Sequence, residues 1–332
     1  MPDLKIVAEA GACNGDIEYA IRAARQAASA GAWGFKVQMY RADKIVTTWA
    51  QRYDHLPSSH DTQHGAFSKT IDYGDWWFVK DLCDDVLGIE FFASCFDTEA
   101  VDACEEMNVN YYKVASGEIT NLPLLRYVGT TGKNVILSTG ASTFTEIHGA
   151  LNALHLPRDN VTLLACSLEY PASAGAMGRI GQLKMAFPKY DIGYSDHTLG
   201  VWSTSVAVAL GATMLEKHYT ITPGEGGDHD MGVTPTELWE MGNIANRTED
   251  LMWTPTAFGP MPEEQDARLL ARRGVYYAKD LRAGERFNAG SVEYLRPVNA
   301  GVYPVDAEGM YGGHMAVAVK ESDGFVPSDV KK

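Results

Sequence analysis

The sequence predicts an α/β fold in which eight parallel strands close into a (β/α)8 TIM barrel, followed by a small C-terminal β domain. Short β-branched or aromatic runs alternate eight times with amphipathic stretches, and eight successive strand–helix units are typical of a closed parallel barrel. The chain has 332 residues, enough for a barrel of roughly 250 residues and a further small domain. A doubly wound open sheet fits the same alternation and remains the alternative fold.

The expected strands are short and are bounded by turn-forming residues. They are Lys5–Ala8, Gly34–Gln38, Glu90–Ser94, Tyr111–Val114, Val135–Ser138, Thr162–Cys166, Ile192–Ser195 and Met214–Lys217. The expected helices lie between most of these strands and after the last one, and each has one apolar face. They are Ile17–Ser29, Trp76–Val86, Glu99–Met107, Leu122–Val128, Thr145–Leu154, Ile180–Ala186, Trp202–Leu210 and Thr236–Leu251.

The segment Arg41–Asp75 departs from this rhythm because it is polar and has no clear period. We expect a long loop there, after the second strand and over the mouth of the barrel. It is either a surface excursion or a lid.

The composition changes after residue 252, where a proline-rich stretch begins. We expect a barrel domain at residues 1–252, a linker at 253–271 and a small domain at 272–332. Turn signals in the small domain separate three strand-like pieces. These are Gly274–Ala278, Arg296–Val298 and Ala316–Val319.

The net charge of −15 argues against nucleic acid or an anionic membrane surface as the main partner, because the long-range field repels both. A local cluster of cations can still bind an anionic small substrate. The five cysteines are scattered and form no C-x-x-C pair, which favours a reducing compartment. Without a recognisable signal peptide or an apolar run of about 18 residues, we expect a cytoplasmic protein.

Polar residues follow all eight expected strands. Because side chains at the carboxyl ends of barrel strands point into the active site, and unpartnered buried polar groups are costly, this pattern predicts a site at that end. The residues are Glu9, Lys36, Gln38, Ser94, Asp97, Lys113, Ser116, Glu118, Ser138, Thr139, Ser167, Glu169, Tyr170, Asp196, His197, Glu216, Lys217 and His218.

His197 and His218 end adjacent expected strands. Neighbouring strands lie about 5 Å apart, so both imidazoles can reach one divalent cation, with carboxylate or water completing its coordination. The alternative is that each histidine is a hydrogen-bonded structural residue.

Lys36, Lys113 and Lys217 would place up to three ammonium groups at the same mouth, close to the hydroxyls of Ser94, Ser116 and Ser138. Lysines with hydroxyls suit a phosphate group. Two alternatives remain: structural ion pairs with Glu9, Glu118 and Glu216, or a Schiff-base lysine as in aldolases.

Eight motifs, in order along the chain, resemble the N-acetylneuraminate (sialic acid) synthase family, which includes the legionaminic and pseudaminic acid synthases. They are AEAG-x-x-NGD (8–16), FKVQ (35–38), YKVASGEITNLPLL (112–125), VILSTG (135–140), SLEYP (167–171), YSDHTLG (194–200), LEKHYT (215–220) and GGDHDMGVTPTEL (226–238). The stretch from residue 270 to residue 304 resembles that family's antifreeze-like domain. The resemblance implies a domain-swapped homodimer in which this domain caps the partner's site.

The resemblance also implies roles for individual residues. It implies a divalent metal, most often Mn²⁺ with Mg²⁺ or Co²⁺ as alternatives, held by His197 and His218. It implies catalytic residues around the reacting carbons, which are Glu9, Lys36, Lys113 and Glu118. It implies substrate-binding residues, which are Ser94, Ser116, Asn121, Ser138, Tyr170, Asp228 and Arg296. Of these, Asp228 would hold sugar hydroxyls and Arg296 the sugar's N-acyl group across the dimer.

The reaction implied is the condensation of phosphoenolpyruvate with an N-acylated amino sugar, such as N-acetylmannosamine, to a nine-carbon 2-keto sugar acid and phosphate. The alternatives are a metal-dependent or Schiff-base aldolase of sugar acids and a non-catalytic, sugar-binding relative. Cys13 stands where the family usually has histidine, in a loop that borders the sugar, so the sugar preference stays open.

Overall fold

The computed structural model describes residues 4–52, 56, 60–225, 227–252 and 258–332. These residues belong to two compact units, Met1–Trp253 and Thr254–Lys332. Each unit is described by itself.

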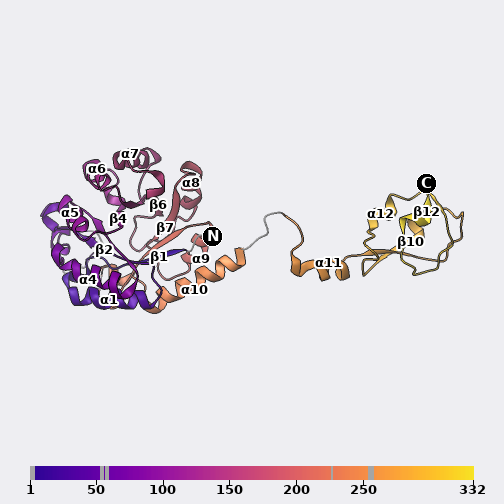
Figure 1. The fold of residues 1–332 in the computed structure, drawn as a ribbon, viewed down its shortest axis with the longest axis horizontal. Helices are drawn as coiled ribbons and strands as arrows, with labels where there is room; N and C mark the ends of the chain where they lie inside the picture. Colours follow the sequence, from indigo (N-terminus) through magenta and orange to yellow (C-terminus); the bar gives the residue numbers. More distant parts are fainter. Residues whose placement is uncertain (1–3, 53–55, 57–59, 226, 253–257) are drawn as a thin grey trace. The chain divides into compact units, whose positions relative to one another are not determined.

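The first unit is a closed barrel of eight strands, each parallel to its neighbours, in the order of the sequence (Figure 1). The strands are β1 (Lys5–Glu9), β2 (Gly34–Met39), β3 (Glu90–Cys95), β4 (Tyr111–Val114), β5 (Asn134–Ser138), β6 (Val161–Cys166), β7 (Asp191–Asp196) and β8 (Met214–His218). The ring closes between β1 and β8, where Glu9 pairs with His218. The predicted barrel is therefore confirmed, and the open sheet is wrong.

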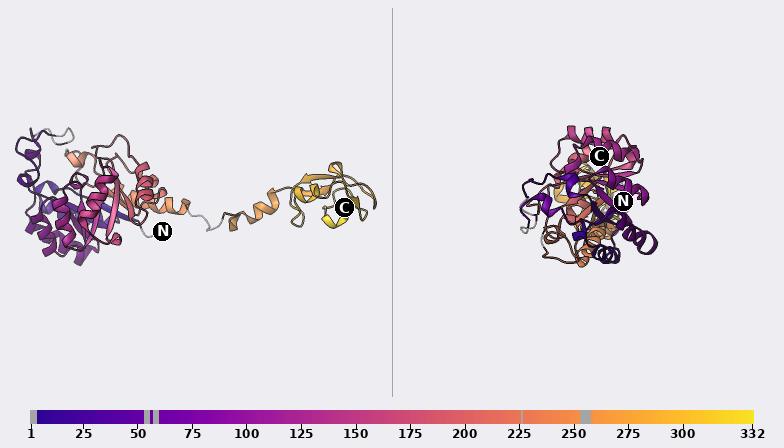
Figure 2. Two further views of the ribbon diagram at one scale, coloured as in Figure 1. Left: turned by 90° about the horizontal axis from the view of Figure 1, so that it is seen from above. Right: turned by 90° about the vertical axis from the view of Figure 1, so that its left-hand side faces the viewer.

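Helices surround the strands, as two further views show (Figure 2). The main ones are α1 (Ile17–Ser29), α4 (Trp77–Leu82), α5 (Thr98–Glu106), α6 (Leu122–Thr130), α7 (Phe144–Leu154), α8 (Gly178–Ala186), α9 (Ser203–Ala209) and α10 (Pro235–Met252). Local sequence fixes their starts: the Asp16 carboxylate accepts two backbone N–H groups at the start of α1, and Thr143 with Glu146 forms a capping box on α7. The expected helix Trp76–Val86 consists of α4 and a π-helical turn over Cys83–Leu87.

Side chains alternate across the barrel wall. Residues on its outer face pack against the helices in one large apolar core. Inside the barrel, an apolar layer fills the end opposite the predicted site. It consists of Val7, Phe92, Ile136, Leu164 and Met214. This layer closes the barrel below the polar residues.

The polar segment after β2 contains two short helices, α2 (Ala42–Ile45) and α3 (Gln63–Ala66). Its Phe67 ring lies 5.5 Å from the Tyr40 ring, which in turn lies 5.7 Å from Phe96 after β3. The segment therefore packs at the carboxyl end of the barrel strands. Residues 53–55 and 57–59 lie outside the described residues, and the role as a lid stays a prediction.

The second unit has its own apolar core, in which the rings of Phe287 and Phe325 stack at 5.2 Å. Two antiparallel pairs and two helices surround it. They are β9 (Gly274–Tyr277) with β10 (Val292–Leu295), β11 (His314–Met315) with β12 (Val330–Lys331), α11 (Gln265–Ala271) and α12 (Pro304–Glu308).

Two of the three strands expected in this unit are misplaced. The Arg296–Val298 piece is not a strand, because Pro297 has no N–H to donate and the pairing ends at Leu295. The strand expected at Ala316–Val319 lies at His314–Met315 instead. Among the described residues no helix has both the length and the apolar content needed to cross a membrane.

Candidate active site

The inward-facing residues at the carboxyl ends of the strands form one buried polar cluster. Its members come from β1–β5, β7 and β8. They are Glu9, Lys36, Ser94, Lys113, Ser138, Ser195 and Glu216. In each of these strands the residue two positions closer to the amino end is apolar, aromatic or glycine, so the polar layer begins at the carboxyl end.

Lys36 is held between two strands by charge and hydroxyl contacts. Its Nζ lies 2.7 Å from Glu9 Oε2 and donates to Ser94 Oγ at 3.1 Å. Glu9 is itself fixed, because its Oε1 accepts from the Gln38 amide at 2.8 Å and from the Gly11 backbone at 3.1 Å. The ammonium group therefore has a defined position at the centre of the barrel.

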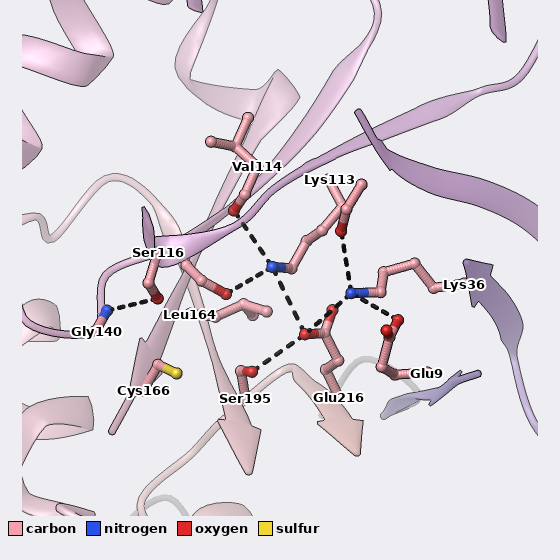
Figure 3. Close-up of polar contacts among 12 residues, drawn as sticks. Glu9, Lys36, Lys113, Val114, Ser116, Gly140, Leu164, Cys166, Ser195 and Glu216 are labelled. Atoms are coloured by element: carbon pink, nitrogen blue, oxygen red, sulfur yellow. Dashed lines mark hydrogen bonds and ion pairs between the residues drawn. The ribbon is translucent and has the colours of Figure 1, made fainter. Parts of the chain in front are cut away.

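Glu216 links the two lysines of the cluster (Figure 3). Its Oε1 lies 3.6 Å from Lys36 Nζ and 3.6 Å from Lys113 Nζ, and it accepts from Ser195 Oγ at 3.1 Å. Lys113 also donates to Ser138 Oγ at 2.7 Å. The ion pairs considered as an alternative for these lysines are thus present with Glu9 and Glu216.

Burial and mutual charge shift the pKa values of this cluster. Burial lowers the pKa of Lys36 to about 7, aided by Lys113 and opposed by Glu216. Burial alone would raise the pKa of Glu216, but Lys113 and Lys36 hold it at about 2. At neutral pH Glu216 is therefore ionised, whereas Lys36 is close to half protonated.

His197 and His218 enter the barrel beside this cluster, with ring centroids 5.3 Å apart. His197 Nδ1 lies 2.6 Å from the Ser167 carbonyl oxygen. A carbonyl only accepts, so Nδ1 carries the proton and Nε2 keeps its lone pair. Burial lowers the pKa of His197 to about 4, and it also lowers the pKa of His218. Both imidazoles are neutral at pH 7, the form that binds metal.

The donors present fit a divalent cation bound by two imidazoles. His218 Nδ1 is buried and has no hydrogen-bond partner among the described residues, and Asp228 Oδ2 lies 3.6 Å from it. Within the described parts of the chain, no group of three or more His, Cys, Asp or Glu side chains is arranged to hold a metal. Water or substrate oxygen would complete the coordination of an ion held by the two imidazoles.

Three other predicted residues follow β4 or β6 and have defined contacts. Ser116 Oγ accepts from the Gly140 backbone N–H at 2.9 Å. Asn121 caps α6 and donates to Glu118 Oε2 at 2.7 Å. The Tyr170 ring lies over that of His197, with 4.1 Å between centroids.

Two of the residues expected at the inner cluster, Lys217 and Asp196, lie on the outer face of the barrel instead. Lys217 points to the outer face of the barrel, where its Nζ lies 2.6 Å from Asp196 Oδ2. Neither Lys217 nor Asp196 belongs to the inner cluster. Lys217 lies between Glu216 and His218, which both point inward, so the alternation of side chains along the strand turns Lys217 outward. Arg296 is an exposed residue of the second unit, and its role at the sugar stays a prediction.

Ser195 and Cys166 also face the centre, although the sequence reasoning did not single them out. The Cys166 thiol lies 3.9 Å from His197 Nδ1. Ser195 could have been predicted from the alternation of side chains along the strand. It lies two residues before His197 and therefore points to the same side.

Comparisons with known proteins agree with this geometry. Residues 23–254 match the model of the NeuB family. The chain is 34% identical over 305 residues to N,N'-diacetyllegionaminic acid synthase of Campylobacter jejuni, covering 89% of this chain and 90% of that protein. It is 26% identical to the N-acetylneuraminate-9-phosphate synthase of Mus musculus, covering 98% of this chain and 92% of that protein.

A solved structure is similar in fold as well as in sequence. It is the N-acetylneuraminic acid synthetase of Leptospira borgpetersenii in complex with citrate, with a TM-score of 0.69 and 29% identity over 80% of this chain and 90% of that chain. The family model covers more than half of this chain, and the Campylobacter relative is matched over most of both lengths. The chain therefore belongs to the NeuB family and is a synthase of the sialic-acid type.

Proposed function

We propose that this enzyme condenses phosphoenolpyruvate with the aldehyde of an open-chain, N-acylated amino sugar. The methylene carbon of phosphoenolpyruvate forms a bond to the aldehyde carbon, and the aldehyde oxygen takes up a proton. Water adds to the former C2 of phosphoenolpyruvate and loses a proton. The resulting tetrahedral carbon expels phosphate as its C–O bond breaks, and its hydroxyl proton leaves with the phosphate as hydrogen phosphate, so that a 2-keto sugar acid remains.

The observation that carries this proposal is the pair of buried, hydroxyl-flanked ammonium groups beside two neutral imidazoles. Lys113 donates to Ser138 and Lys36 to Ser94, and both ammonium groups lie 3.6 Å from the same Glu216 oxygen inside the barrel. Donors fixed in a buried site stabilise an anion more than they do in water, because no solvent has to reorganise.

The charges of the cluster support a bound metal ion. The two lysines are balanced by Glu9 and Glu216, so these four groups sum to zero when all are ionised. Phosphoenolpyruvate carries close to three negative charges at neutral pH, about two of them on phosphate. An additional cation at His197 and His218 would make the site positive. We propose Mn²⁺ there, with Mg²⁺ or Co²⁺ as alternatives; when bound, the ion supplies Lewis-acid polarisation of the aldehyde oxygen.

The chain's own residues then bind, orient and exchange protons. Lys113 and Lys36 bind the anionic groups of phosphoenolpyruvate. The Glu216 carboxylate contacts both ammonium groups and so fixes their positions. We assign Glu118, which accepts a hydrogen bond from Asn121, to proton transfer near the carbon that water attacks. We assign Asp228, whose Oδ2 lies 3.6 Å from His218 Nδ1, to accepting hydrogen bonds from sugar hydroxyls.

A Schiff-base aldolase is the second candidate, and one observation favours it. A pKa of about 7 makes Lys36 partly neutral, as a lysine nucleophile must be. Against it, the Lys36 ammonium is in direct contact with the Glu9 carboxylate at 2.7 Å. The two reactions can be told apart because an aldolase would release no phosphate.

A substrate panel tests the proposal. Enzyme with Mn²⁺ is incubated with phosphoenolpyruvate and each of several sugars, including N-acetylmannosamine, its 6-phosphate and related diacetamido sugars. We expect phosphate release and a product mass equal to sugar plus phosphoenolpyruvate plus water minus phosphoric acid, for at least one sugar. Pyruvate-dependent condensation without phosphate release would support the aldolase, and no product with any sugar would support a non-catalytic sugar-binding protein.

The affinity for phosphoenolpyruvate is expected to weaken as pH rises above 7. Only the protonated Lys36 attracts the anion, and its pKa of about 7 means that the protonated fraction in the free enzyme falls about tenfold per pH unit above that value. We expect the Kd to rise by up to about 15-fold between pH 7 and pH 8.5, with uptake of a proton on binding. Calorimetry in buffers of different ionisation enthalpy measures both quantities.

Lys36→Arg is the matched variant for this pH effect. Arginine stays charged at these pH values, so the variant is expected to bind without proton uptake and with a flat pH profile. A wild-type Kd that does not change between pH 7 and pH 8.5 would contradict the assigned role of Lys36.

The sugar, the dimer and the second unit stay proposals. The named products of the two relatives differ, since one name specifies a phosphorylated product and the other does not. We propose a domain-swapped homodimer in which Arg296 of each chain reaches the partner's sugar.

A further inference from the structure

The outer face of the barrel wall behind the two histidines carries a buried ion pair that the reaction does not use. Asp196 and Lys217 are paired neighbours in the β7–β8 ladder. Both are buried, and Lys217 Nζ lies 2.6 Å from Asp196 Oδ2. Each directly precedes one of the two histidines in sequence.

Further hydrogen bonds complete this pair. Asp196 Oδ1 accepts from the Thr198 backbone N–H at 2.9 Å and from Thr198 Oγ1 at 2.8 Å. Asp196 Oδ2 also accepts from Ser203 Oγ at 2.5 Å, at the start of α9. Lys217 Nζ donates in addition to the Thr198 carbonyl. The side chain of a β8 residue thus binds the backbone on the far side of His197.

The same contacts connect to the loop after β6. Tyr194 OH donates to the Gly175 carbonyl at 2.7 Å and to Asp196 Oδ1 at 3.3 Å. The Ala172 N–H donates to the His197 carbonyl at 2.8 Å. Both the loop that carries Tyr170 and the residues on either side of His197 are therefore tied to the outer wall.

A buried ion pair is a weak way to stabilise a fold. The desolvation of both charges offsets their attraction, and well-packed apolar replacements are often as stable. A carboxylate that binds one ammonium, one backbone N–H and three hydroxyls does, however, fix the geometry of the groups around it, because these contacts are directional.

We propose that Asp196 and Lys217 are positioning residues that hold the ends of β7 and β8 so that the His197 and His218 imidazoles can bind one metal ion. We refer to Asp196, Lys217 and Thr198 as the outer brace. This inference rests on the proposed metal role of the two histidines. The brace contacts neither substrate nor metal, and it acts through the backbone of the residue that follows Asp196 and Lys217 in each strand.

The test is the affinity for metal in full-length protein, measured by electron paramagnetic resonance of free Mn²⁺, together with the visible spectrum of bound Co²⁺ and thermal unfolding. In the double variant Asp196→Leu/Lys217→Met we expect the fold to be retained. We expect the Kd for Mn²⁺ to rise by about 10- to 100-fold, the size of effect seen when groups that orient metal ligands are removed, and the Co²⁺ bands to shift.

Two further variants keep the test decisive. Lys80→Met/Asp84→Leu removes another Lys–Asp pair, on α4 and the turn that follows it, and is expected to bind Mn²⁺ as the wild type does. Thr198→Val is isosteric and removes only one hydroxyl bond to Asp196, so it decides the question if the double variant does not fold. We expect roughly a three- to tenfold weaker Mn²⁺ affinity in Thr198→Val.

The outcomes separate the two proposals. If the wild type does not bind Mn²⁺, the metal site is wrong and the outer brace falls with it. If the wild type binds Mn²⁺ and the folded double variant or Thr198→Val binds it with unchanged affinity and an unchanged Co²⁺ spectrum, the metal site stands and the outer brace alone is overturned.

Discussion

His218→Ala is expected to lower kcat/KM by about 10³-fold or more while the barrel stays folded. The substitution removes one of the two imidazoles proposed to hold the metal, and Lewis-acid stabilisation is worth several kcal/mol, at about 1.4 kcal/mol per tenfold in rate. His218 Nδ1 has no hydrogen-bond partner among the described residues, so its removal orphans no hydrogen-bond donor and the cost to unfolding free energy is expected to stay below about 2 kcal/mol. Phosphate release and Mn²⁺ binding measure the two effects.

His148→Ala is the matched control, because His148 packs on Phe187 away from the strand ends. It is expected to keep wild-type Mn²⁺ affinity. The acid side of the pH profile gives a second check. Since burial holds the pKa of His197 at about 4, metal affinity should persist down to about pH 5 and fall below it. Full turnover by His218→Ala in metal-free buffer would refute the metal role.

Glu216→Gln is expected to cost about 3–5 kcal/mol of unfolding free energy, the usual result of removing one partner from a buried ion pair. Glu216 Oε1 lies 3.6 Å from both Lys36 Nζ and Lys113 Nζ. Without its charge, Glu9 alone would balance the Lys113 ammonium and the protonated form of Lys36. Chemical denaturation with and without saturating phosphate or phosphoenolpyruvate measures the cost.

The added anion distinguishes a catalytic cluster from a purely structural one. A bound phosphate replaces the missing negative charge, so it should stabilise Glu216→Gln more than it stabilises the wild type. Glu99→Gln is the control: Glu99 also contacts two cations, Arg41 at 3.3 Å and Lys44 at 3.1 Å, but all three side chains are about half exposed. This control should cost less than about 1 kcal/mol. Equal stabilisation of Glu216→Gln and the wild type by the anion would argue against an anion site between the lysines.

The sequence predicted all eight barrel strands because each is a short apolar run between turn-forming residues. The observed strands mostly extend by a residue or two, as β8 does to His218, since ladder pairing with a neighbour carries the strand past its apolar run. The closure of the ring through the pairing of Glu9 with His218 depends on contacts between distant segments, which local pattern does not encode.

The site was predicted less evenly than the fold. Lys217 was counted among the inward residues because three polar residues in succession end β8, although a strand can turn only alternate ones inward. Ser195 and Cys166 escaped notice because a small hydroxyl or thiol within a strand resembles ordinary core. In the second unit, Pro297 marked the end of a strand that the apolar pattern alone placed too late.

An apolar layer closes the barrel interior on one side of the site, so the site opens at the carboxyl ends of the strands. The layer consists of Val7, Phe92, Ile136, Leu164 and Met214. Under the proposed function, the anion rests on the lysines just above that floor, and the sugar stands above the anion, near the histidines. Depth in the barrel then sets the order in which the ligands bind and dissociate. The ligand that binds deepest must bind first and dissociate last. Phosphoenolpyruvate therefore binds before the sugar, and inorganic phosphate dissociates after the sugar acid.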